Sequence, residues 1–67
     1  MGEIVLNGKV RDVAEGATLT ELLADLKLDS RWVVAELNGE PLPRERFAKV
    51  ALAAGDRLEL VRPVAGG

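Results

Sequence analysis

Short apolar segments alternate along the chain with turn sequences, and this pattern predicts the first two strands. Residues 3–6, EIVL, are mostly apolar and partly β-branched, and Asn7-Gly8 follows them directly. Asn-Gly favours the two-residue turn of a β-hairpin, because both residues tolerate a positive φ. The returning strand is then KVRDV at residues 9–13, and Glu15-Gly16 ends it.

The next segment has the spacing of an amphipathic helix. Thr18 and Glu21 stand three residues apart, as in a capping box, where each side chain accepts a hydrogen bond from the other residue's backbone N–H. The apolar residues that follow occupy positions i, i+3, i+4 and i+7 of one stripe: Leu19, Leu22, Leu23 and Leu26. We expect one helix of about ten residues whose stripe packs against the hairpin.

A second hairpin is predicted from WVVAEL at residues 32–37, which Asn38-Gly39 follows. Its partner, EPL, is short, and Pro41 and Pro43 have no N–H to donate to a strand ladder. Such a strand belongs at the edge of a sheet.

The rest of the chain leads to a final strand. Residues 44–54 have no clear period, and we expect Phe47 and Leu52 to pack beneath the sheet. Gly55-Asp56 then turns the chain into RLELVR at residues 57–62. Pro63 ends the pairing, because it has no N–H.

The order of these elements predicts an α+β domain with a mixed sheet of about five strands and one helix on one face. Trp32, Phe47 and the leucine stripe are the predicted core, from their size and spacing. The chain of 67 residues has room for one such domain, which we place at residues 1–63. Residues 64–67 form a predicted flexible tail.

Charge and composition exclude several classes of protein. The net charge is −2, so no basic stripe is available to replace the counterions of a nucleic acid. No apolar run approaches the roughly 20 residues that span a bilayer, and no segment has the pattern of a signal peptide. We expect a monomeric cytoplasmic protein that binds neither nucleic acid nor membranes.

The inventory of reactive side chains is small. The chain has no Cys and no His, and therefore no thiolate, no imidazole base and no ordinary zinc site. Ser30 has no histidine to activate it. We predict that the protein is not an enzyme and has neither catalytic residues nor a bound metal or cofactor.

Three segments resemble the ThiS-type sulfur carriers of the ThiS/MoaD ubiquitin-like family: LNGEPLPRERF, LAAGDRLELV and the terminal VAGG. The resemblance runs from the first strand to Gly67 and implies the ubiquitin-like β-grasp fold. Phe47 stands where many relatives have Trp. The MoaD carriers of molybdopterin synthesis also end in Gly-Gly, but their middle segment does not look like NGEPLPRERF.

The resemblance implies a co-substrate role for the carboxyl terminus. An E1-like adenylyltransferase (ThiF-type) uses MgATP to adenylate the carboxylate of Gly67. Sulfur from a cysteine desulfurase or a sulfur-relay protein then replaces AMP and leaves a thiocarboxylate. Thiazole synthase (ThiG-type) takes that sulfur for the thiazole of thiamine.

The sequence of the tail agrees with this role. The tail, Val64, Ala65, Gly66 and Gly67, extends roughly 13 Å when fully stretched, which is enough to enter a partner's active site. Glycine at the last two positions leaves no Cβ to block a narrow channel.

Three alternatives remain open from the sequence. MoaD-like or tRNA-thiolation carriers share the same terminus, and a ubiquitin-like protein modifier uses the same adenylate. The third possibility is a β-grasp interaction module whose tail is inert.

A docking surface is predicted from strand alternation. If Ile4, Leu58 and the other inward residues face the helix, the open face of the sheet carries three valines and three glutamates: Val5, Val34 and Val61, rimmed by Glu3, Glu36 and Glu59. We expect the three valines to form a partner-binding surface beside the strand that leads to the tail.

Overall fold

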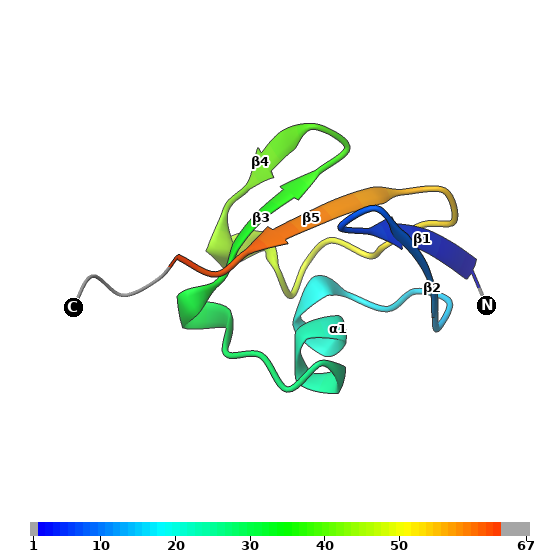
Figure 1. The fold of residues 1–67 in the computed structure, drawn as a ribbon. Helices are drawn as coiled ribbons and strands as arrows, with labels where there is room; N and C mark the ends of the chain where they lie inside the picture. The colour runs from blue at the N-terminus through cyan, green and yellow to red at the C-terminus, as the bar shows by residue number, and fades with distance from the viewer. Residues whose placement is uncertain (1, 64–67) are drawn as a thin grey trace.

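Two layers make up the fold: a sheet, and below it a helix with the irregular connections (Figure 1). The computed structural model describes residues 2–63, so the predicted tail at residues 64–67 lies outside the described residues. The elements in chain order are β1 (Gly2–Leu6), β2 (Lys9–Val13), α1 (Leu19–Asp25), the 3-10 turn η1 (Ser30–Trp32), β3 (Val34–Leu37), β4 (Glu40–Leu42), the 3-10 turn η2 (Arg44–Arg46) and β5 (Arg57–Val61).

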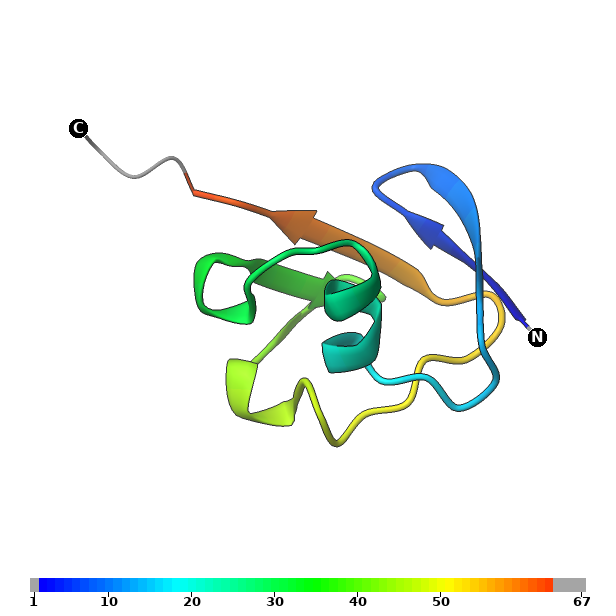
Figure 2. The same ribbon diagram turned by 90° about the horizontal axis from the view of Figure 1, so that it is seen from below.

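The sheet has five strands in the order β2-β1-β5-β3-β4. β5 pairs in parallel with β1 on one side and antiparallel with β3 on the other. The short β4 pairs with β3 and lies at the edge, as Pro41 and the following Pro43 predicted. Seen from below, α1 lies across one face of the sheet (Figure 2). The predicted mixed sheet of about five strands with a helix on one face is therefore observed.

Both hairpins turn at Asn-Gly, as the sequence predicted. Asn7 and Gly8 have φ values of 50° and 83°, and Asn38 and Gly39 have 53° and 83°. The consecutive positive φ angles are those that a type I′ turn requires, and they explain why Asn and Gly stand at these positions.

The helix begins with the predicted capping box. Thr18 Oγ1 accepts a hydrogen bond from the backbone N–H of Glu21 at 3.2 Å, and Glu21 Oε1 accepts one from the N–H of Thr18 at 2.9 Å. These two bonds satisfy N–H groups that have no partner inside the helix.

The helix is shorter than the expected ten residues, because α1 covers seven. Lys27 follows its C-cap with φ of 59°, in the left-handed region. The N–H of Lys27 bonds to the carbonyl of Ala24 at 3.1 Å, and the N–H of Leu28 to that of Leu23 at 2.9 Å. This is the Schellman arrangement, which closes a helix.

The core lies between the sheet and α1. Its buried members are Ile4, Val13, Leu19, Leu22, Leu23, Val33, Ala35, Phe47, Leu52 and Leu58. Leu26, the last residue of the predicted stripe, is half-buried against this cluster. Phe47 and Leu52 pack beneath the sheet as predicted, with 2% and 4% of their surface exposed.

The prediction that Trp32 belongs to the core is wrong, because 64% of its surface is exposed. The sequence pattern placed Trp32 in a strand, but β3 begins only at Val34. Trp32 ends η1 instead, and a carboxylate oxygen of Asp29 caps this turn by accepting a hydrogen bond from the N–H of Arg31 at 2.9 Å. The alternation of a strand therefore does not apply to Trp32.

Candidate functional site: the strand that leads to the Gly-Gly terminus

β5 occupies the middle of the sheet and is the last strand of the chain in residues 2–63 (Figure 1). Its pairing with β3 ends at Val34 and Val61. Pro63 follows two residues later and has no N–H to continue a ladder. The pairing of β5 thus ends two residues before Pro63, and residues 64–67 lie outside the described part of the chain.

Asn7 holds the end of β5 on the β1 side. β1 ends at Leu6, so the backbone of Leu60 extends beyond the last residue of its neighbour. Asn7 Oδ1 accepts a hydrogen bond from the N–H of Leu60 at 2.8 Å, and Asn7 Nδ2 donates to the carbonyl of Leu60 at 3.3 Å. The side chain of Asn7 thereby forms the hydrogen bonds that a further residue of β1 would otherwise form with Leu60.

Asn38 holds the start of β5 on the opposite side. Its Oδ1 accepts from the N–H of Arg57 at 2.9 Å, and its Nδ2 donates to Asp56 Oδ1 at 3.0 Å. Asp56 Oδ2 also accepts from the N–H of Ala53 at 2.8 Å, which closes the turn before β5. The two Asn-Gly turns therefore fix β5 from both sides.

Sequence reasoning treated both asparagines only as turn residues. An Asn at the first turn position is a possible signal of such a contact. Gly would also adopt the turn, but it has no side-chain amide to form these hydrogen bonds. The sequence alone does not show which strand lies beside each turn.

The outer face of the sheet bears the predicted valines, but they do not form one patch. Val34 and Val61 stand directly opposite each other and are 52% and 59% exposed. Val5 stands opposite Arg57 on β5, four residues before Val61. At the rise of a strand, this separates Val5 from Val61 by about 13 Å.

Val5 has a different apolar neighbour, Val10, which sequence reasoning missed. The two residues are paired across β1 and β2, and Val10 is 66% exposed. The outer face thus has two separate apolar pairs, and the pair Val34–Val61 is the one at the end from which the tail starts.

Arg44 has a structural contact that the sequence did not suggest. It is exposed, as expected for a surface arginine, but its Nε donates to the carbonyl of Ser30 at 2.9 Å. Its guanidinium also donates to the carbonyl of Arg31 at 3.2 Å. Arg44 therefore connects η2 with η1.

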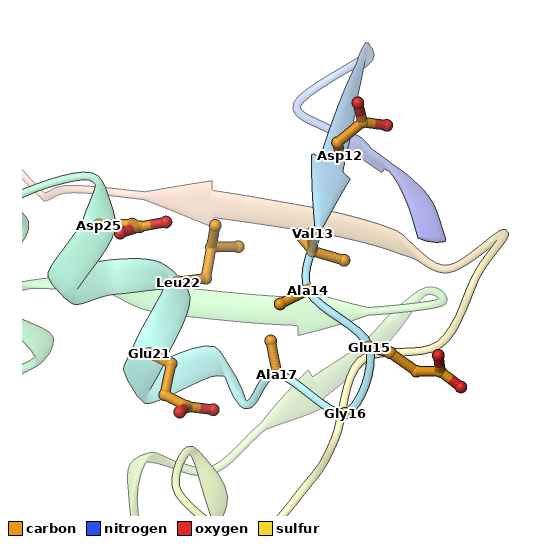
Figure 3. A pocket seen from close by; sticks show the side chains of 9 residues that line it. All are labelled: Asp12, Val13, Ala14, Glu15, Gly16, Ala17, Glu21, Leu22 and Asp25. Carbon is orange, nitrogen blue, oxygen red and sulfur yellow. The ribbon is translucent and has the colours of Figure 1, made fainter. Parts of the chain in front are cut away.

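A pocket of about 280 Å³ lies between the end of β2, the following loop and α1. It is lined by four carboxylates among other residues: Asp12, Glu15, Glu21 and Asp25. These groups stand at separate corners and do not converge (Figure 3). In residues 2–63, no group of three His, Cys, Asp or Glu side chains is placed to hold a metal ion.

The described part of the chain also has no helix that is long and apolar enough to cross a membrane. The most specific geometry is that of β5 and the two asparagines, whose side chains hold the strand on both sides.

Comparison with known proteins decides the family. A model of the ThiS family matches residues 4–67. The chain belongs to the ThiS family. The membership that the three segments predicted is therefore confirmed, and the match includes the Gly-Gly terminus.

Two curated ThiS proteins match over nearly their whole length. The chain is 38% identical over 63 residues to the sulfur carrier protein ThiS of Bacillus subtilis. The aligned residues are 92% of this chain and 96% of that protein. It is 31% identical over 65 residues to the sulfur carrier protein ThiS of Escherichia coli, with 97% and 98% covered.

A longer relative contains a similar segment. A thiazole synthase of Paramagnetospirillum magneticum is 40% identical over 65 residues, which are 97% of this ThiS-family chain and 20% of that protein. The chain therefore spans about a fifth of this relative.

Solved structures confirm the β-grasp fold that the resemblance implied. The crystal structure of the thiamine biosynthesis protein ThiS from Geobacter metallireducens has a TM-score of 0.83 and 40% identity, with 97% of this chain and 99% of that chain covered. A solution NMR structure of a thiamine biosynthesis protein from the same organism has a TM-score of 0.78 at 40% identity, with 97% and 87% covered.

Proposed function

We propose that this ThiS-family chain carries sulfur as a thiocarboxylate on Gly67 for the synthesis of the thiazole of thiamine. The observation that supports this most is that the family match runs through to residue 67. The curated sulfur carriers and the related segment in a thiazole synthase support sulfur transfer to the thiazole.

The chemistry takes place at the terminus and needs no catalytic side chain of the carrier. A carboxylate is a poor electrophile, so an E1-like enzyme first transfers AMP from MgATP to Gly67 and releases pyrophosphate. A sulfur nucleophile supplied by a cysteine desulfurase or relay protein attacks the acyl carbon, and AMP leaves. Thiazole synthase then takes the sulfur from the thiocarboxylate. The carrier is a protein co-substrate in each step.

The fold contributes a rigid base for the tail. β5 is fixed on both sides, so a tail of four residues reaches roughly 13 Å from a defined point. Val64, Ala65, Gly66 and Gly67 are the residues proposed to enter the active sites of the two enzymes, while the domain remains outside.

The test is conversion of Gly67 by the cognate E1-like enzyme with MgATP and a sulfide source. Intact-mass spectrometry should detect the replacement of one terminal oxygen by sulfur. A chain extended by one residue beyond Gly67 is the matched control and should not be converted. Absence of exchange with an enzyme that charges another carrier would contradict the assignment.

The valine pair at the tail end is the proposed contact for these enzymes. Burying one valine contributes about 1.5 kcal/mol, so Val61→Asp should weaken binding about tenfold or more. Val10→Asp, an equally exposed valine at the far side of the sheet, is the matched control and should leave binding unchanged. Equal affinities of the two variants by calorimetry would remove the valine pair from the contact.

A further inference from the structure

Two glutamates face each other on the uncovered side of the sheet. Glu36 on β3 and Glu59 on β5 are directly opposed in the antiparallel register, and both are exposed. Opposed side chains on one face have Cβ atoms about 5 Å apart. Like charges in this position destabilise a sheet, so the pair calls for an explanation.

The charges of neighbouring strands do not neutralise this pair. On the β4 side, Glu36 stands opposite Pro41, which has no charge. Arg57 lies two residues before Glu59 and points to the same face by alternation. Among residues 2–63, however, no ion pair or hydrogen bond engages the carboxylate of Glu36 or of Glu59.

The glutamates and the tail-end valines form one continuous surface. Val34 and Val61 are the next opposed pair on the same face, two residues closer to the tail. We call these four residues, Val34, Glu36, Glu59 and Val61, the tail-end patch. It combines an apolar contact with two adjacent negative charges at the point where the chain leaves the sheet.

We propose that the tail-end patch binds thiazole synthase, and that this enzyme places an arginine or lysine side chain between Glu36 and Glu59 beside an apolar surface. The inference rests on the proposed function, because an enzyme that receives Gly67 must lie within the roughly 13 Å reach of the tail. A guanidinium is opposite in charge to both carboxylates and has enough N–H groups to donate to each of them.

The two glutamates should affect the stability of the free domain and its affinity for thiazole synthase in opposite directions. Like charges directly opposite each other on a sheet disfavour the free domain, and in the complex a cation between them offsets this effect. Replacing one carboxylate by the neutral amide of the same shape should therefore stabilise the free protein and weaken the complex. A surface glutamate that has no carboxylate opposite it and no binding role changes neither quantity much.

The experiment compares Glu59→Gln and Glu36→Gln with the natural chain, using purified thiazole synthase and isothermal calorimetry. We expect each variant to bind about fivefold more weakly or worse, with a smaller dependence on salt concentration. The melting temperature of each free variant should rise by about 2 °C or more.

The sheet itself provides the matched control. Glu3 and Asp12 are a second opposed acidic pair, at the other end of β1 and β2. Glu3→Gln should raise the melting temperature in the same way and leave the affinity for thiazole synthase unchanged. This separates a local contact from the general effect of net charge.

Three results would overturn the proposal: unchanged affinity of Glu59→Gln, no binding of the natural chain to thiazole synthase, or a loss of affinity only for the E1-like enzyme. Formation of the Gly67 thiocarboxylate is measured on every variant by mass. Conversion of the natural chain together with the first or the third result leaves the proposed function intact and rejects the tail-end patch alone. Absence of binding to thiazole synthase would also contradict the proposed delivery of sulfur to the thiazole.

Discussion

Asn7→Gly tests whether the turn side chain holds the end of β5. Glycine keeps the hairpin, because position 7 has a positive φ that glycine adopts without strain. The backbone N–H of residue 7 also keeps its bond to the carbonyl of Leu58, at 2.9 Å. The variant therefore removes only the two side-chain bonds to the backbone of Leu60.

The expected loss of stability follows from those two bonds. Each neutral hydrogen bond contributes about 0.5–1.5 kcal/mol net, which gives about 1–3 kcal/mol for the pair. For a domain of this size, a loss of 2 kcal/mol lowers the melting temperature by about 8–16 °C. Urea unfolding followed by circular dichroism measures the difference in free energy.

Amide hydrogen exchange locates the effect. In Asn7→Gly the N–H of Leu60 loses its acceptor and should exchange much faster, whereas the N–H of Arg57 stays protected. Asn38→Gly is the reciprocal control, because Asn38 accepts from Arg57 and not from Leu60. A Leu60 amide that remains protected in Asn7→Gly would refute the role assigned to Asn7.

Three further predictions concern the rest of the domain. Lys27→Gly should stabilise the protein by about 0.5–1 kcal/mol in thermal unfolding, because Lys27 has a left-handed φ of 59° that glycine prefers. Phe47→Ala should lower the free energy of unfolding, measured in urea, by about 3–5 kcal/mol, because Phe47 is buried. Trp32→Ala should lower it clearly less, because the Trp32 side chain is 64% exposed. Similar losses in the two variants would contradict the burial assigned to these side chains. The hydrogen bonds from the side chain and the backbone of Arg31 lower the pKa of Asp29 to about 2, so NMR should show its carboxyl titrating there. In Arg31→Ala the backbone N–H still donates to Asp29, so the pKa should rise toward the usual value of 3.8 without reaching it. The contribution of this exposed pair to stability is present above pH 3.8 and disappears as the pH falls through 2, and salt should weaken it.

The parts of the fold that the sequence predicted are set by local chemistry. The Asn-Gly turns and the capping box of Thr18 and Glu21 depend on residues that are neighbours in the chain. The end of α1 was not predictable in the same way, because its left-handed residue is Lys27, whereas Gly or Asn is the usual signal.

Trp32 shows where a hydrophobic pattern misleads. WVVAEL has the composition of a strand, and the size of Trp favours burial. Asp29 nevertheless caps a 3-10 turn through Trp32, so the strand begins two residues later. The sequence alone did not indicate that this cap competes with the strand. Trp32 remains exposed as a consequence.

The candidate surface differs from the predicted one because alternation and register are separate properties. Alternation assigns a side chain to one face of a sheet, and it placed Val5, Val34 and Val61 correctly on the outer face. Register decides which residues are neighbours, and it is set by where two strands that are distant in sequence begin to pair. The parallel pairing of β1 with β5 places Val5 beside Arg57, while the antiparallel pairing of β3 places Val34 beside Val61. A partner that covers Val61 and receives the terminus therefore contacts Glu59 and Glu36 before it reaches Val5.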